Sequence, residues 1–450
     1  MTTDDGAVTT GDAAVTASAS AAVTPGLPTR LLNRNFLLLW QGQLVSQLGN
    51  QAFFLAMVLW LMEATGSASL MGLIMMVSLL PSVVLGPFGG TLADRYPRVR
   101  IIIASDLIRG VAVLGLAAFL FSWPDATASA TFVLFGVAVL GGVTNAAFQP
   151  AIAAAIPDLL PADKVAAGNS MNQFTVQAST LVGQALGGFL YAVVGAPVLF
   201  LVDGVSYLLS AVSESFIRIP ATRRDTDSTP GPRTSDDGER TAGYFAETVE
   251  GFRYVWDRIG MRAFLLFASG VNFLVMPVII LLPFYATDVI AQDPAWYGYL
   301  LAALGGGSII GYLVAGTPTV APARRSQMVI MAFAAVAASI IAVSFVRTPV
   351  LALILFALVG AFSGTINIFV LTLIQLATPS AIRGRVMAVV ITLASAVAPL
   401  GMAIGGVLGD ATGKNIPLVY LGCGSLIGLL VLAAAAHPAL REFLSSETAS

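Results

Sequence analysis

The sequence predicts an all-α integral membrane protein with twelve transmembrane helices in two six-helix bundles related by an internal repeat. Three observations predict this fold class. The 450 residues are 57% hydrophobic and only 10% charged, a composition typical of membrane proteins. Apolar runs long enough to cross a bilayer core recur six times on each side of a polar linker. The fifth run of each half also carries the same glycine pattern.

Twelve segments bounded by charges or by Pro and Gly clusters are the expected spanning helices. They are Phe36 to Met62, Ser69 to Ala93, Ile101 to Ser122, Ser129 to Pro150, Val165 to Ala192, Pro197 to Ile217, Ala263 to Thr287, Trp296 to Thr317, Gln327 to Val346, Pro349 to Ala377, Arg385 to Leu408 and Ile416 to Ala436.

The segments between and around these helices complete the domain organisation. We expect a disordered cytoplasmic tail over 1–33, a six-helix bundle over 34–219, a cytoplasmic linker over 220–262, a second six-helix bundle over 263–437 and a cytoplasmic tail over 438–450. In the linker, Phe245, Val249, Phe252 and Trp256 recur at helical spacing. This part is expected to form an amphipathic helix on the membrane surface.

The internal repeat is visible in GQALGGFLYAVVG from Gly183 and GMAIGGVLGDATG from Gly401. At a constant offset of 218, the matching pairs are Gly183/Gly401, Ala185/Ala403, Gly187/Gly405, Gly188/Gly406, Leu190/Leu408 and Gly195/Gly413, and Pro161 matches Pro379 in the same way. Two similar bundles that face each other around a central path would show such a repeat.

The basic residues predict the orientation, because cytoplasmic loops carry the excess of Lys and Arg. With the N-terminus inside, the cytoplasmic set is Arg30, Arg34, Arg95, Arg98, Arg100, Lys164, the linker arginines, Arg324, Arg325, Arg383, Arg385 and Arg441. Only Arg347 and Lys414 then face outward. We therefore expect a multi-pass protein of the inner (cytoplasmic) membrane with both termini cytoplasmic.

The loop between the second and third helices, GGTLADRYPRVR from Gly89 to Arg100, concentrates charge between two apolar runs. Gly89 and Gly90 would let another helix approach closely. Asp94 would face the positive N-terminal end of a neighbouring helix, while the arginines contact carboxylates or lipid phosphates. These contacts would close the cytoplasmic side in one state and break in the other. A basic loop without a switching role is the alternative.

At this loop the sequence resembles the major facilitator superfamily, whose signature Gly90, Asp94, Arg95 and Arg98 match, whereas Pro97 replaces the second glycine. The stretches RNFLLLWQGQLVSQLGN, FQPAIAAAIPDLLPADKVAAGNS, LVDGVSYLLSA and PSAIRGRVMAV resemble the branch of drug-efflux proteins, macrolide-efflux proteins and siderophore exporters. The resemblance implies that Gly90, Asp94, Arg95 and Arg98 belong to an inner gate and that substrate passes between the bundles. It further implies an antiporter linked to antibiotic resistance.

Several other functions lack the residues they require. One cysteine, Cys423, and one histidine, His437, exclude disulfide frameworks, most metal sites and Ser/His/Asp triads. The nearest approach to a P-loop, GDATGKN from Gly409, has the wrong spacing. A net charge of −2 argues against nucleic-acid binding. We expect no enzyme activity, no cofactor and no metal.

Amide side chains within the predicted helices indicate a substrate cavity, because amides in hydrocarbon need polar partners. Gln43, Gln47 and Asn50 share one face of the first helix, and Gln173 and Gln177 share a face of the fifth. The remaining cavity candidates are Phe54, Asn145, Asn272 and Asn367. Helix-packing contacts are the alternative role for these amides.

Proton coupling needs a carboxylate that changes its charge inside the membrane. Asp106 and Asp203 are the deepest acids by position, each six residues into its helix. Arg109 lies one turn from Asp106, so these two are expected to form an ion pair. Asp203 has no local cation and is the first choice for titration, with a cap or interhelical hydrogen bond as the alternative. Glu63, Glu214 and Asp288 are expected in water at helix ends.

Together these features predict a secondary active transporter that works by alternating access and exports drugs or secondary metabolites in exchange for protons. Its partners would be a small amphipathic organic substrate, protons and membrane lipids, with the protein acting as a monomer. Siderophore export or lysolipid transport is the runner-up, and a non-transporting membrane sensor is a further alternative.

Overall fold

The computed structural model describes residues 30–218, 249–315, 322–379 and 382–445, and these are nearly all helical, with no strand among them. The first half holds α1 (Arg34–Thr65), α2 (Ala68–Arg95), α3 (Arg98–Ser122), α4 (Thr127–Leu159), η1 (Ala162–Lys164) and α5 (Val165–Ser215). The second half holds α8 (Ile259–Ile280), α9 (Leu282–Phe284), η2 (Tyr285–Val289), α10 (Ala295–Ala315), α11 (Pro322–Phe345), α12 (Pro349–Ala377), α13 (Arg383–Ala396), α14 (Ala398–Ala411), α15 (Ile416–Ala436) and α16 (Pro438–Ser445).

Twelve membrane crossings follow from the helix lengths. Within the described residues, eleven helices are long and apolar enough to span a membrane. One of them, α5, has 51 residues, or roughly 76 Å at 1.5 Å per residue, which is more than twice a bilayer core of roughly 30 Å. It bends at Gly195, where φ is 74° and ψ is 172°. The two arms of α5 are therefore separate spans, and the predicted twelve helices are confirmed.

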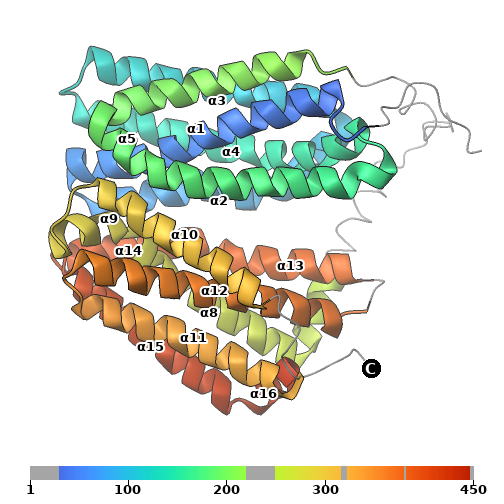
Figure 1. The fold of residues 1–450 in the computed structure, drawn as a ribbon, viewed down its shortest axis with the longest axis vertical. Coiled ribbons are helices and arrows are strands. Elements are labelled where there is room, and N and C mark those ends of the chain that lie inside the picture. The colour runs from blue at the N-terminus through green and yellow to red at the C-terminus, as the bar shows by residue number, and fades with distance from the viewer. Residues whose placement is uncertain (1–29, 219–248, 316–321, 380–381, 446–450) are drawn as a thin grey trace, which may run out of the picture.

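The helices form two bundles that lie side by side (Figure 1). In the first bundle, α1 packs on α5 and α2 packs on α4. In the second bundle, α8 packs on α14 and α10 packs on α12. The same pattern of helix pairing thus occurs in each half of the chain.

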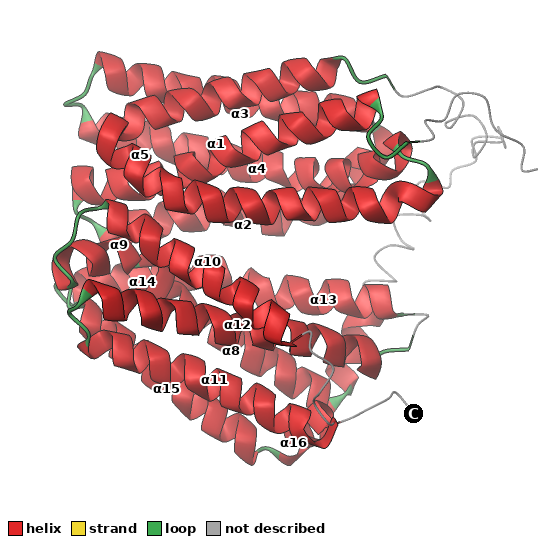
Figure 2. Cartoon of the chain, viewed as in Figure 1, coloured by secondary structure: helices red, strands yellow, loops and turns green. Residues whose placement is uncertain are grey.

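The two ends of the molecule differ in how the bundles meet. We call the end where α2 joins α3 and α12 precedes α13 the basic end, and the end where α1 joins α2 the apposed end. The bundles contact each other through α2 with α14 and through α5 with α10. The close contacts of these pairs involve the first turns of α2 and α10, which lie at the apposed end, on the left in Figure 2.

The predicted repeat is confirmed in the geometry of the matched glycines. A Cβ on Gly188 would collide with the backbone of Ala295 in α10, and one on Gly406 would collide with the backbone of Ala68 in α2. Each glycine therefore permits one of the two contacts between the bundles. The matched pair Gly195 and Gly413 also agrees, with φ of 74° and 60° respectively, a left-handed conformation that glycine adopts readily.

The eleventh span is broken where the sequence predicts one continuous helix from Arg385 to Leu408. α13 ends at Ala396, and α14 begins one residue after Val397. Pro399 lies in the first turn of α14. Its nitrogen has no hydrogen to donate to the preceding turn, so the helical hydrogen bonding is interrupted at this point.

The seventh span also departs from the predicted continuous helix. α8 ends at Ile280 and is followed by the short α9 and the π-helical η2. Pro283 stands in the first turn of α9, where it removes a backbone donor. The Tyr285 hydroxyl donates to the carbonyls of Val343 and Val346, at 3.3 Å and 3.2 Å. The end of this span is therefore anchored to the end of α11.

The linker is helical over residues 249–257, the part that the structure describes. Phe252 and Trp256 are exposed and their rings stack at 5.4 Å, while Val255 is fully buried. Glu250 forms an ion pair of 2.6 Å with Arg385 at the start of α13. Phe245 lies outside the described residues.

Candidate functional site

The loop from Gly89 to Arg100 turns without any residue at positive φ. α2 ends at Arg95, Tyr96 is extended with φ −111° and ψ 156°, and Pro97 precedes α3 with φ −58°. A proline is well suited to this position, since its φ is fixed near −65°. Pro97, which replaces the second glycine of the signature that this loop resembles, therefore fits the backbone conformation of the turn.

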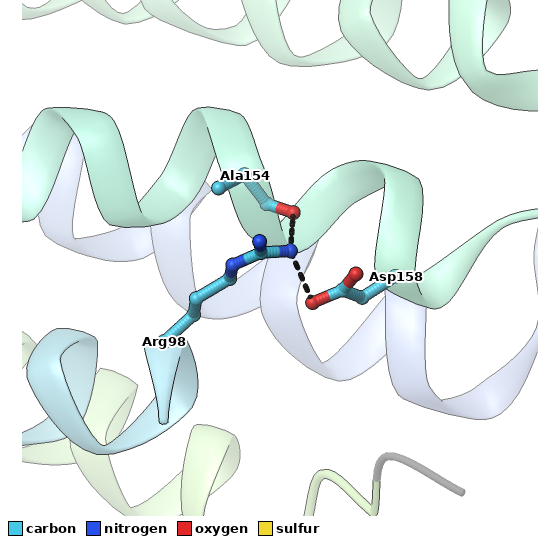
Figure 3. Close-up of polar contacts among 3 residues, drawn as sticks. All are labelled: Arg98, Ala154 and Asp158. Atoms are coloured by element: carbon cyan, nitrogen blue, oxygen red, sulfur yellow. Dashed lines mark hydrogen bonds and ion pairs between the residues drawn. The ribbon is translucent and has the colours of Figure 1, made fainter. Parts of the chain in front are cut away.

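Arg98 ties this loop to α4. Its Nη1 donates to Asp158 Oδ2 at 2.6 Å and to the Ala154 carbonyl at 2.9 Å (Figure 3). Both side chains are partly exposed, at 31% for Arg98 and 26% for Asp158. The ion pair lies within the first bundle, so it fixes the loop to its own bundle.

Of the other predicted inner-gate residues, Gly90 and Arg95 have open surroundings. Gly89 packs against the backbone of Ala146 in α4, as expected for a close helix approach. A Cβ on Gly90 would meet nothing within 4 Å. Arg95 is exposed, and the Asp94 side chain lies outside what the structure describes.

A carboxylate contact that the sequence analysis missed joins the bundles at the apposed end. Asp410, near the end of α14, accepts hydrogen bonds from the Ala68 nitrogen at 3.0 Å, the Ser69 nitrogen at 2.9 Å and the Ser67 hydroxyl at 2.8 Å. A carboxylate at a helix N-terminus is stabilised by the free N–H groups and the helix dipole. We call this contact the Asp410 latch.

A cavity of about 200 Å³ lies inside the first bundle. Its lining comes from five helices and includes Asn50, Phe53, Phe54, Arg109, Asn145, Asp203 and Tyr207. A smaller cavity of about 50 Å³ beside it shares Asn50, Arg109, Asn145 and Tyr207 and adds Gln47. Polar and aromatic side chains thus share one space within the membrane-spanning region.

Arg109 is held by groups of α4 and α5. Its Nε donates to the Thr144 hydroxyl at 2.8 Å, and its Nη2 donates to Asn145 Oδ1 at 3.3 Å. The guanidinium also lies over the Phe148 ring at 4.8 Å and the Tyr207 ring at 5.9 Å. Arg109 also lines the cavity, so its positive charge faces this space.

The predicted ion pair between Asp106 and Arg109 is wrong. Both oxygens of the Asp106 carboxylate lack a hydrogen-bond partner, and the side chain is fully buried. Arg109 instead extends towards α4, where Thr144 offers an oxygen. A spacing of three residues permits such a pair, but here the partners on the neighbouring helix are preferred.

Asp203 is fully buried, and neither of its oxygens has a hydrogen-bond partner. A Cβ on Gly49 would lie 2.7 Å from Asp203 Oδ1, so this glycine leaves room for the carboxylate against α1. The alternative of a capping or interhelical hydrogen bond is therefore absent for this side chain. It borders the larger cavity.

Glu214 corrects a further prediction. It was expected in water at a helix end, yet it is fully buried. Its Oε1 accepts from Gln43 Nε2 at 2.9 Å and from the Ser210 hydroxyl at 3.3 Å, while Oε2 has no partner. Glu63 and Asp288 are exposed, as predicted.

The predicted cavity residues fall into three groups. Gln47, Asn50, Phe54 and Asn145 line the two cavities described above. Gln43 is buried against Glu214. Gln173, Gln177, Asn272 and Asn367 are exposed side chains that line neither cavity.

Among the described residues, no group of three or more His, Cys, Asp or Glu side chains is arranged to hold a metal ion.

Residues 39–401 match the family model described as the Major Facilitator Superfamily. The multidrug efflux pump Tap of Mycolicibacterium fortuitum is 29% identical over 415 residues, covering 90% of this chain and 96% of that protein. The pump of the same name from Mycobacterium tuberculosis is 27% identical over 418 residues, covering 90% and 94%. Macrolide efflux protein A of Streptococcus pyogenes is 26% identical over 283 residues, covering 62% and 66%.

Solved transporters share the fold at low identity. A bacterial homolog of the human lysosomal transporter Spinster, inward-facing and unoccupied, has a TM-score of 0.62 and 16% identity, covering 93% of this chain and 94% of its own. The D-xylose-proton symporter has a TM-score of 0.63 and 15% identity, covering 88% and 96%. The family model spans most of the chain and the twelve-helix fold agrees with it: the protein belongs to the Major Facilitator Superfamily.

Proposed function

We propose that the protein is a secondary active transporter of the cell membrane that exports amphipathic organic molecules in exchange for protons. One observation carries the proposal: Asp203 is buried without a hydrogen-bond partner at the edge of a cavity lined by aromatic rings, amides and Arg109. The similarity to proteins named multidrug and macrolide efflux pumps supports the direction and the substrate class.

The chemistry of the cavity beside Asp203 is suited to the exchange of an organic molecule for a proton. An ionised carboxylate without donors is costly in a low-dielectric interior, so Asp203 is stabilised by a proton or by a cation such as Arg109. Release of the proton would leave a charge whose pairing depends on the arrangement of the surrounding helices. Protonation can therefore bias the equilibrium between two conformations.

Alternating access would use the two ends of the molecule in turn. The Asp410 latch joins the bundles at the apposed end, while Gly90 has free space at the basic end. Because basic loops favour the cytoplasm, the basic end would be cytoplasmic and this conformation inward-facing. In the outward-facing state, the latch would break and Gly90, Asp94, Arg95 and Arg98 would close the inner gate.

The remaining features of the proposal follow the same orientation. Both termini would be cytoplasmic, with bundles over 34–219 and 263–437, a cytoplasmic linker over 220–262 and tails over 1–33 and 438–450. The exposed rings of Phe252 and Trp256 would contact lipid at the cytoplasmic surface. The protein would act as a monomer without enzyme activity.

Accumulation assays in an efflux-deficient bacterial host test this function. Wild type, Asp94→Asn and the surface control Asp288→Asn would be compared on a panel of dyes, macrolides, siderophores and lysolipids, with and without a protonophore. We expect wild type and Asp288→Asn to lower accumulation of some dye or macrolide, and the protonophore or Asp94→Asn to abolish the difference. A response confined to siderophores or lysolipids, or one that survives the protonophore, would contradict the proposal.

A further inference from the structure

A third cavity, of about 770 Å³, lies at the apposed end, separate from the cavity beside Asp203. Trp60 and Glu63 of α1 and Tyr191 of α5 supply one side, and Asp293, Trp296 and Tyr299 of the second bundle supply the other. Its volume falls in the range of sites that hold drug-sized molecules. We call it the outer cavity.

Five of the thirteen residues that line the outer cavity are aromatic. Trp296 and Tyr299 lie edge to face, with ring centroids 5.8 Å apart. Trp60 is partly exposed and Tyr191 is almost fully buried. Indole and phenol faces attract cations through their quadrupoles, tryptophan most strongly.

The charges of the outer cavity are all of one sign. Glu63 and Asp293 are its charged lining residues, and no Lys or Arg lines it. Glu63 Oε2 accepts from the Tyr191 hydroxyl at 2.6 Å, which orients this carboxylate. Neither acid has an ion-pair partner among the described residues, so their negative charge is not neutralised locally.

The outer cavity depends on the contact between the two bundles. It borders Ala295, the residue that packs against Gly188 across the interface. Separation of the bundles at this end would divide its lining between two surfaces. A ligand that contacts both sides therefore favours the conformation in which the apposed end is closed.

From these features we infer that the outer cavity is a binding site for an organic cation, such as a quaternary ammonium with an apolar substituent. The ammonium group lies between the tryptophan faces and the carboxylates of Glu63 and Asp293. The apolar substituent packs on Phe189 and Tyr299, two exposed side chains that line the outer cavity. This site is distinct from the cavity beside Asp203, and its occupancy does not require transport.

The experiment uses the full chain labelled with 5-fluorotryptophan in lipid nanodiscs. The five tryptophans are Trp40, Trp60, Trp123, Trp256 and Trp296, and single Trp→Phe variants assign their ¹⁹F resonances. Benzyltrimethylammonium is the probe, and its uncharged carbon isostere, 2,2-dimethylpropylbenzene, is the matched neutral compound. We expect the cation to shift the resonances of Trp60 and Trp296 saturably while the other three stay in place.

Variants separate charge recognition from simple apolar binding. Glu63→Gln with Asp293→Asn should raise the Kd for the cation about tenfold or more, because both charges are lost while the Tyr191 hydroxyl keeps an acceptor. Asp288→Asn, an exposed acid outside the cavity, should leave the Kd unchanged. Unmoved resonances of Trp40, Trp123 and Trp256 show that each variant is folded, and Asp293→Asn alone provides a milder second test.

Two results would overturn the inference. The first is equal affinity of wild type and the double variant for the cation. The second is a saturable response of Trp60 and Trp296 to the neutral compound as strong as to the cation. Because the readout is binding, loss of transport in the accumulation assay would leave this result unaffected, and the two proposals can fail separately.

Discussion

The two bundles share a backbone design but differ in the chemistry of their interiors. Matched glycines, Gly188 with Gly406 and Gly195 with Gly413, occupy equivalent contacts and turns in the two halves. Among the described residues, however, every buried Asp or Glu side chain belongs to the first bundle: Asp106, Asp203 and Glu214. Apart from tyrosines and Cys423, the buried polar side chains described in the second bundle are Ser339, Ser344 and Thr378.

This difference separates what an internal repeat must preserve from what it can change. Glycines at helix crossings are constrained by backbone distances, which are the same in both halves. Titratable groups are constrained only by the reaction they serve, and one set is sufficient for coupling. We therefore expect that charge changes in the first bundle control the coupling of protons to transport. The second bundle would contribute mainly by moving relative to the first.

The largest expected effect comes from removing the unpaired carboxylate, in Asp203→Asn. Uptake of dye into inverted vesicles driven by a proton gradient should fall to background, because the amide cannot exchange a proton. Exchange of dye without a gradient should persist, since the cavity lining is otherwise retained. Asp288→Asn is the matched control. Gradient-driven transport by Asp203→Asn at the wild-type level would contradict the asymmetry between the bundles.

A bulky side chain at a contact between the bundles should have the next largest effect, and it should be equal in the two halves. Gly188→Leu and Gly406→Leu would each displace a backbone, and overpacking of this kind costs typically about 1–3 kcal/mol. Distances between spin labels at the apposed end should lengthen in both variants. Gly422→Leu, at a position with free space, is the control, and a shift in only one of the two variants would show that the interfaces are not equivalent.

The buried carboxylates of the first bundle form no contact equivalent to the Asp410 latch. Loss of the latch should have an intermediate effect. Asp410→Asn keeps one acceptor oxygen but loses charge-assisted hydrogen bonds to the α2 N-terminus, worth on the order of 1.5–3 kcal/mol. The spin-label distances should again lengthen, but in a smaller fraction of the molecules than with Gly406→Leu. Asp410→Glu tests geometry at constant charge. An unchanged distance distribution in Asp410→Asn would exclude a role in closing the apposed end.

The repeated parts of the fold were predictable from sequence because they depend on length and local backbone freedom. Apolar runs define spans, and glycines at one offset define the repeat. The breaks at Val397 and after Ile280 were missed, although Pro399 and Pro283 are visible in the sequence. Proline within an apolar run is compatible with a continuous kinked span, so pattern alone does not decide between a kink and a break.

The burial of a site residue was predictable from the sequence only where its position along a single helix determines that burial. Counting residues from the helix start gives the burial of Asp106 and Asp203 correctly. The same count places Glu214 at a helix end, yet Gln43 of α1 covers it. The Asp410 latch joins groups more than 340 residues apart in the chain, and no local pattern records that contact.

The smallest effect is expected at the ion pair between Arg98 and Asp158. Both side chains are partly exposed, and pairs of this kind contribute roughly 0.2–1 kcal/mol. Asp158→Asn should therefore lower the thermal unfolding temperature only slightly. Arg98→Lys should weaken the second hydrogen bond, to the Ala154 carbonyl, because the lysine ammonium is carried on a shorter side chain than the guanidinium. A double-mutant cycle on unfolding temperature measures the pair itself. A coupling several times larger than this range would mean that the basic loop contributes to stability as strongly as a buried group.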